Sequence, residues 1–193
     1  MVLRIRNNIV LASASPSRKM LLEKAGIPFT VKVSGVDETV PEDYTPAQTV
    51  ECLASRKGHA VQPLCGKEDA IIAADSVVSI DGKILGKPKD DQVAKATLRR
   101  LSGRTHQLYT GVCLLAAGKE QVFHAVTQVT FYPLTEEEIE AYVAAGESRG
   151  RAGSYGIEGI GVVLVQSIQG DYSNIVGLPV AETLRRLAAM TGN

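Results

Sequence analysis

The sequence has little of what marks binders of nucleic acid or proteins of the membrane. It has no tryptophan, and aromatic residues make up only 5% of its 193 residues, so few rings are available for bases to stack on. Basic and acidic residues balance at 21 each, which indicates no polyanion-binding surface. No stretch approaches the roughly 20 apolar residues that span a bilayer. We therefore expect a cytoplasmic protein that binds neither nucleic acid nor membranes.

Cysteine and histidine are also scarce and scattered. The cysteines are Cys52, Cys65 and Cys113, an odd number without CxxC spacing, which favours reduced thiols over disulfides. None of the three histidines forms a pair with another zinc ligand at the usual spacing, so a zinc site is excluded. If a metal binds, carboxylates are the remaining ligands. Carboxylates favour Mg²⁺ or Mn²⁺, with phosphate oxygens and water completing the coordination.

The length suits one sizeable core but not two ordinary domains with a linker, so we expect residues 1–193 to form a single domain. Strand and helix patterns alternate, with both crossover and hairpin connections. This mixture predicts an α/β fold with a mixed sheet. The expected strands are residues 9–12, 29–33, 70–80, 106–116, 121–132 and 162–168. The expected helices are residues 16–26, 45–61, 91–101, 135–146 and 179–190.

One carboxylate, Asp75, lies inside the apolar strand expected at residues 70–80. Burying an unpaired ionised carboxylate costs several kcal/mol or more, so Asp75 must meet a cation, a hydrogen-bond network or a ligand. Three cations and a second acid elsewhere in the chain are candidate partners: Arg18, Lys57, Lys87 and Glu38. Such a set of side chains suits a site for phosphates and a hard metal ion.

The turn from the first strand into the first helix carries small hydroxyl residues. Ser15 is a good N-cap, and Pro16 suits the first helical position. Backbone N–H groups at such a helix start form a ready anion site, to which Arg18 can add a charged contact. The same residues also fit an ordinary capped helix with a solvated arginine, and the local pattern leaves both open.

Lys57 lies on the apolar stripe of the helix expected at residues 45–61, in register with Leu53 and Val61. A lysine there either extends to the solvent or directs its ammonium to an acid or phosphate. Its neighbour Arg56 lies off the stripe and is expected to be solvated. Lys87 precedes a proline, which favours an extended backbone. Its local sequence by itself indicates a surface residue.

The densest glycine segment is residues 150–161, which matches neither the dinucleotide-binding fingerprint nor the P-loop. Its glycines allow close approach of a ligand to the backbone, and Glu158 is the one acid in it. Ser154 lies in a pattern similar to a degenerate nucleophile elbow. All three histidines precede it, however, whereas the histidine of such a triad follows the serine, so a serine hydrolase is not expected.

Several blocks together resemble the Maf family of nucleoside triphosphate pyrophosphatases, once known as septum-formation inhibitors. The resemblance extends over nearly the whole chain, in order. It implies an elongated mixed sheet flanked by helices in two lobes with a central cleft, as in the inosine triphosphatase fold, and a homodimer. The blocks are residues 11–18 (LASASPSR), 36–38 (VDE), Lys57, 73–76 (AADS), 86–88 (GKP), 101–103 (LSG), 109–112 (YTGV), 152–159 (AGSYGIEG) and 176–179 (VGLP).

The resemblance also implies roles. Asp75 matches a general base, and Glu38 an acid near the metal; whether Asp75 is the base, a metal ligand or both stays open. The implied reaction is hydrolysis between the α and β phosphates, giving a nucleoside monophosphate and pyrophosphate with a divalent cation. The implied phosphate-contacting cations and pocket-lining serines are Arg18, Lys57, Lys87, Ser13 and Ser15.

Three positions bear on the choice of base. The branch of the family that acts on dTTP and UTP typically has arginine, threonine and glutamine where this chain has Ser17, Ser76 and Glu158. The 7-methyl-GTP branch has tryptophan, glutamine and glutamate there. Ser76 and the adjoining GSYGI block resemble the first branch, whereas Glu158 resembles the second. We expect dTTP, UTP or modified relatives as substrates; the alternatives are 7-methyl-GTP and a non-catalytic, nucleotide-binding regulator of septum formation.

Overall fold

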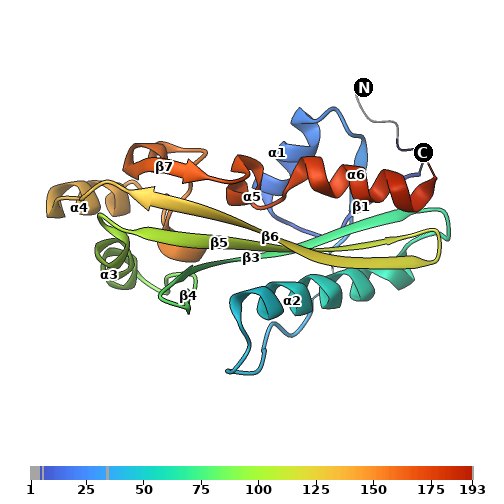
Figure 1. Cartoon of the computed structure of the whole chain (residues 1–193), viewed down its shortest axis with the longest axis horizontal. Helices are drawn as coiled ribbons and strands as arrows, with labels where there is room; N and C mark the ends of the chain where they lie inside the picture. The colour runs from blue at the N-terminus through green and yellow to red at the C-terminus, as the bar shows by residue number, and fades with distance from the viewer. Residues whose placement is uncertain (1–4, 6, 34, 193) are drawn as a thin grey trace.

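The computed structural model describes residues 5, 7–33 and 35–192, and within them seven strands form one mixed sheet (Figure 1). The spatial order is β2-β1-β3-β5-β6-β7, and β4 pairs with β3 off this path. β1 runs parallel to both β2 and β3, and every other pairing is antiparallel. The strands are β1 Ile9–Leu11, β2 Phe29–Val31, β3 Ala70–Ile80, β4 Lys83–Leu85, β5 Thr105–Ala116, β6 Lys119–Phe131 and β7 Val165–Gln169. The predicted α/β fold with a mixed sheet is confirmed.

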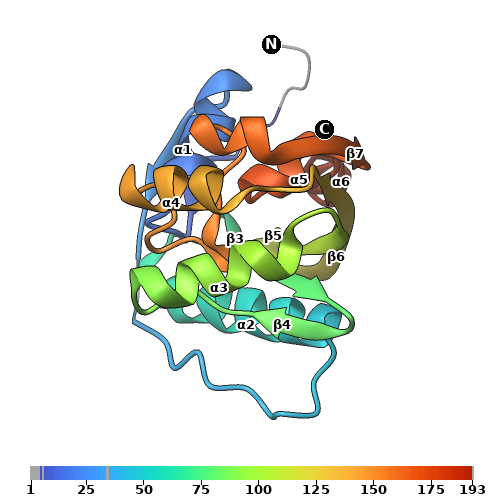
Figure 2. The same cartoon turned by 90° about the vertical axis from the view of Figure 1, so that its left-hand side faces the viewer.

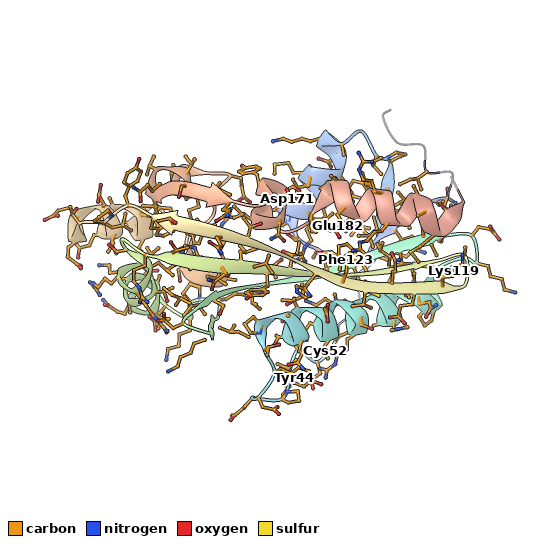
Figure 3. All side chains as sticks on the ribbon, in the orientation of Figure 1. Tyr44, Cys52, Lys119, Phe123, Asp171 and Glu182 are labelled. Atoms are coloured by element: carbon orange, nitrogen blue, oxygen red, sulfur yellow. The ribbon has the colours of Figure 1, made fainter. Side chains whose placement is uncertain are left out.

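Helices flank this elongated sheet on both faces (Figure 1). α2 covers one face, while α1, α5 and α6 lie on the other; Cys52 of α2 and Glu182 of α6 mark the two sides in Figure 3. The α-helices are α1 Pro16–Lys24, α2 Pro46–Val61, α3 Asp91–Leu101, α4 Glu136–Ala144, α5 Tyr172–Val176 and α6 Val180–Thr191. Three 3-10 helices complete the list: η1 Gln62–Leu64, η2 Ala152–Ser154 and η3 Ile160–Leu164. No helix in the described part of the chain has the length and apolar character needed to cross a membrane.

Local signals in the sequence set several element ends. Thr45 and Thr135 each begin a helix with a reciprocal capping box, in which the third helical residue bonds back to the cap. The turn between β3 and β4 places Asp81 and Gly82 at φ values of 54° and 73°, as a tight hairpin requires. The helix expected at residues 91–101 has those bounds in the structure.

Two expectations about local structure were confirmed only in part. Residues 162–168 were expected as a strand, but the first three belong to η3 and the strand begins at Val165. The run of apolar residues there gives no clear period, and Val163 is 73% exposed rather than buried in a sheet. Ser15 occupies the N-cap position of α1, yet its side chain makes no capping hydrogen bond. The short helix α5 was not expected.

The ends of β3 are buried, but its middle is not. Residues 70–74 and 78–80 are buried, whereas Asp75, Ser76 and Val77 are only partly so. The pairing of β3 explains this difference. β1 ends at Leu11, opposite Ile72 of β3, and β4 pairs only with residues 78–80, so neither strand covers the edge of β3 between them. The sheet therefore opens beside Asp75, where β1 diverges toward α1, a usual place for a ligand site in α/β sheets.

Gly111 of β5 lies opposite Asp75 in the sheet. Because Gly111 has no side chain, α2 packs close to the backbone of β5 at this point. A Cβ atom at position 111 would overlap the carbonyl of Val50 in α2 and lie 2.7 Å from the backbone nitrogen of Glu51. The helix that carries Lys57 thus packs on the backbone of β5 without an intervening side chain.

We expect Gly111→Ala to lower the free energy of unfolding by about 3 kcal/mol, since the helix must move away from a well-packed sheet. Thermal unfolding measures this loss. Gly86→Ala is the matched control, because a Cβ at Gly86 has no atom within 4 Å. Equal melting temperatures for the two variants would contradict the close approach of α2.

Candidate active site

A cavity of about 760 Å³ lies at the open edge of β3. It collects residues from β3, β5, α1, α2, α5 and several loops that are far apart in the sequence. All ten residues singled out from the sequence line it, and their roles stay predictions: Ser13, Ser15, Ser17, Arg18, Glu38, Lys57, Asp75, Ser76, Lys87 and Glu158.

Lys57 bridges two carboxylates at one side of this cavity. Its Nζ donates to Oδ1 of Asp75 at 2.6 Å and lies 2.7 Å from Oε1 of Glu38. The side chains of Lys57 and Asp75 are only 18% and 14% exposed, so the lysine points inward rather than extending to the solvent. The hydrogen bond from Lys57 holds the pKa of Glu38 below its usual value, and the charges of Lys57, Lys87 and Arg18 act in the same direction against burial.

Asp75 and Ser76 are adjacent in β3 and therefore point to opposite faces of the sheet. Asp75 meets Lys57 of α2, while Ser76 Oγ accepts a hydrogen bond from Arg18 Nη2 of α1 at 3.0 Å. Ser76 also shares a 2.9 Å hydrogen bond with Thr110 of β5. One short piece of strand thus connects the helices on the two faces at the cavity.

Arg18 is a buried cation without a carboxylate bound to it in the described part of the chain. It is 8% exposed, and its guanidinium donates to the Gly177 carbonyl at 2.7 Å and to Ser13 Oγ at 3.2 Å, besides Ser76. Burial lowers the pKa of Arg18, and the charges of Asp75 and Glu38 oppose that shift. A buried charge is costly unless it is paired, so this arginine has room for an anion supplied by a ligand.

The start of α1 adds to the anion-binding character of this wall. Ser15, Pro16 and Ser17 line the cavity at the N-terminus of the nine-residue helix, where no side chain caps the backbone N–H groups. Lys87 lines the cavity from the loop after β4 and has no hydrogen bond or ion pair within the described residues. This geometry fits an anion site at residues 13–18, which stays a prediction.

A separate cluster surrounds Glu158. Its Oε1 accepts hydrogen bonds from Ser17 Oγ and from Arg151 Nη1, the latter at 2.9 Å. Burial raises the pKa of Glu158, but these hydrogen bonds outweigh it and hold the pKa below the usual value. Arg151 and Arg149 line the cavity and were not singled out from the sequence. The sequence feature that could have identified them is that both arginines lie at the start of the glycine-rich segment that carries Glu158.

Arg56 was expected to be solvated; it is partly exposed, but its guanidinium is bound to a loop of the protein. Its Nη1 donates to the carbonyl of Asp37 at 3.1 Å and to the carbonyl of Thr39 at 2.6 Å. These residues flank Glu38 in the irregular segment between β2 and α2, which runs as a long loop in Figure 2. Two neighbouring side chains of α2 therefore hold this loop: Lys57 through the carboxylate of Glu38, and Arg56 through the backbone on either side of it.

We expect Arg56→Met to lower kcat/KM about tenfold, because Glu38 is then held by Lys57 alone and is displaced for part of the time. Steady-state kinetics with a nucleoside triphosphate measure the loss, and limited proteolysis measures exposure of residues 35–44. His59→Ala, on the next turn of the same helix, is the control. Unchanged kinetics and unchanged cleavage in Arg56→Met would contradict an anchoring role.

The carboxylates offer a small set of hard oxygen donors. No group of three or more His, Cys, Asp or Glu side chains in the described residues is arranged to hold a metal ion. The Oδ1 of Asp75 and the Oε1 of Glu38 nevertheless converge on one point, the ammonium of Lys57. Two carboxylates fit a Mg²⁺ ion that takes its other ligands from substrate phosphates and water.

The sequence was compared with protein families and with proteins of known name. The model of the Maf-like protein family matches residues 8–190. A dTTP/UTP pyrophosphatase of Bacillus cytotoxicus is 50% identical over 178 residues, which cover 92% of this chain and 93% of that protein. A protein of the same name from Bacillus cereus is 48% identical over 179 residues, or 93% of each chain.

Two solved structures are also similar. A Ham1 protein of Staphylococcus aureus has a TM-score of 0.39 and 19% identity, over 64% of this chain and 71% of that one. A nucleoside-triphosphatase / dITP/XTP pyrophosphatase of Mycobacterium abscessus has a TM-score of 0.43 and 18% identity, over 94% and 92%. Since the family model spans most of the sequence and the Bacillus relatives share nearly their full length with it, the chain belongs to the Maf-like protein family.

Proposed function

We propose that this protein is a nucleoside triphosphate pyrophosphatase that hydrolyses the bond between the α and β phosphates and releases a nucleoside monophosphate and pyrophosphate. The observation that carries the proposal is Arg18, a buried guanidinium with no carboxylate bound to it, in the same cavity as the Lys57–Asp75 pair. The names of the Bacillus relatives support dTTP and UTP as the substrates.

The geometry supports a division of roles. Arg18, Lys57 and Lys87 would bind the phosphates and stabilise the charge that develops on the leaving pyrophosphate. Asp75, held by Lys57 at the open edge of β3, would orient the attacking water and accept its proton.

Glu38 and Asp75 would hold a divalent cation, Mg²⁺ or Mn²⁺, together with phosphate oxygens of the substrate. When bound, such an ion supplies a positive charge that polarises the phosphoryl group and neutralises the leaving group. The ammonium of Lys57 now lies between these two carboxylates and would turn toward the substrate phosphates when the ion binds. The cytoplasmic location and the homodimer implied by the family resemblance stay predictions.

The test is a panel of nucleotides assayed for pyrophosphate, orthophosphate and monophosphate. dTTP, UTP, CTP, ATP, GTP and 7-methyl-GTP are each incubated with the protein in Mg²⁺, in Mn²⁺ and in EDTA. We expect equimolar monophosphate and pyrophosphate from dTTP and UTP, and none in EDTA. Orthophosphate as the first product would contradict the assigned bond. Preference for 7-methyl-GTP would favour the alternative substrate, and binding without turnover would favour a regulator.

A further inference from the structure

The cavity has two regions of different charge. Arg18, Lys57 and Lys87 carry three positive charges against the two negative charges of Asp75 and Glu38. The remaining carboxylate of the cavity wall, Glu158, is instead paired with its own cation, Arg151. The first region suits the phosphates, whereas the second has no net charge and suits an uncharged, polar group of a ligand.

The hydrogen bonds of this pair leave one acceptor and several donors for a ligand. Ser17 and Arg151 both donate to Oε1 of Glu158, so neither of them uses Oε2. The guanidinium of Arg151 has five N–H donors, of which this bond uses one, and its side chain is 31% exposed. An acceptor and a donor from two side chains thus lie next to each other on the cavity wall.

Arg151 is fixed in place by close packing on the backbone. A Cβ atom at position 156 would overlap the guanidinium of Arg151, so the side chain lies directly against Gly156. The N–H of Gly156 in turn donates to Tyr142 Oη at 3.1 Å, which ties this part of the loop to α4. A donor held in this way loses little conformational entropy when a ligand binds.

The complement of an acceptor next to a donor is a ligand edge with an N–H next to a C=O. Uracil and thymine present this edge at N3–H and the 4-carbonyl, and guanine presents it at N1–H and the 6-carbonyl. Cytosine and adenine have the reverse order, with a ring nitrogen acceptor beside an amino donor. Glu158 is ionised at neutral pH, so its carboxylate can only accept hydrogen bonds. Against cytosine or adenine, it would face a ring nitrogen that is also an acceptor, and no hydrogen bond could form.

We propose that Arg151 is a specificity-determining residue, which together with Glu158 forms a nucleobase subsite selective for bases with an adjacent N–H and C=O. This inference rests on the proposed function for the identity of the ligand as a nucleotide. Glu158 accepts from the ring N–H through Oε2, and Arg151 donates to the carbonyl beside it. The two residues together supply the acceptor and donor that a single glutamine amide carries by itself.

The test compares UTP with CTP, which differ at this edge alone. We expect Arg151→Met to reduce the ratio of kcat/KM for UTP over CTP by about tenfold or more, since the carbonyl loses its donor. Arg149→Met is the control, because Arg149 lines the same cavity but pairs with Asp91. The ratio of kcat/KM for UTP over CTP in this variant should equal that of the wild type.

The outcomes separate this proposal from a structural role of Arg151 and from failure of the proposed function. An equal loss of kcat/KM for UTP and CTP in Arg151→Met would overturn it. If Arg151→Met does not fold, Arg151→Lys serves instead, with a smaller fall in the ratio expected. Calorimetry with UMP and CMP gives a readout without turnover. Preference for UMP in an inactive protein would uphold the subsite and reject the pyrophosphatase, and equal binding of UMP and CMP would overturn the subsite.

Discussion

Replacing Asp75 by asparagine should reduce kcat for dTTP hydrolysis by about 10³-fold, within the range expected for loss of a general base. Asparagine has the same shape but cannot accept a proton from water at neutral pH. The fold should survive, because Lys57 keeps its ion pair with Glu38 and the asparagine oxygen can still accept from Lys57. Pyrophosphate release measures the loss, and circular dichroism and thermal unfolding check the fold.

Asp81→Asn is the matched control, since it makes the same change six residues further along. Asp81 lies in the turn between β3 and β4, away from the cavity lining, and pairs with Arg104 at 2.8 Å. Asparagine tolerates its positive φ well. A kcat of Asp75→Asn within tenfold of this control would rule out Asp75 as the base.

Arg18→Lys should lower kcat/KM for dTTP about 100-fold, even though the charge is kept, because a lysine cannot reproduce a fork of several donors. The guanidinium now binds three different acceptors, Ser13, Ser76 and Gly177, and thereby sets the position of its remaining N–H groups. One ammonium cannot reach all three. Pyrophosphate should raise the melting temperature of the wild-type protein and have much less effect on this variant.

Two further variants distinguish phosphate binding from a general loss of structure. Ser76→Ala removes one acceptor from Arg18 but keeps the guanidinium, so we expect a smaller loss of stabilisation by pyrophosphate than in Arg18→Lys. Arg99→Lys changes an exposed arginine that pairs with Glu136, outside the cavity, and should leave stabilisation by pyrophosphate unchanged. Equal stabilisation of wild type and Arg18→Lys by pyrophosphate would show that Arg18 does not bind the phosphates.

The sequence was enough for most of the fold, because the signals involved are local. The capping box at Thr45, the Asp81–Gly82 turn and the long apolar strands depend on residues within a few positions of one another. The strand expected at residues 162–168 was placed three residues too early for the opposite reason. An apolar run flanked by glycines fits a strand or a 3-10 turn equally well, and packing rather than pattern decides.

The candidate site was predictable where a residue conflicts with its surroundings. Asp75 in an apolar strand and Lys57 on an apolar stripe each indicate a partner, although neither reveals that the partner is the other one. Arg56 and Arg151 could not be found in this way. Their partners are backbone carbonyls of a distant loop and an acid in a glycine-rich segment, which come close only in the folded chain.

A structure with a non-hydrolysable α,β-imido analogue of dUTP and Mg²⁺ would test most directly whether the two regions of the cavity bind the phosphates and the base. We expect the triphosphate beside Arg18, Lys57 and Lys87, the α phosphorus within reach of a water bound to Asp75, and the uracil edge at Glu158 and Arg151. Phosphates lying at Glu158, or an analogue bound outside the cavity, would contradict the account.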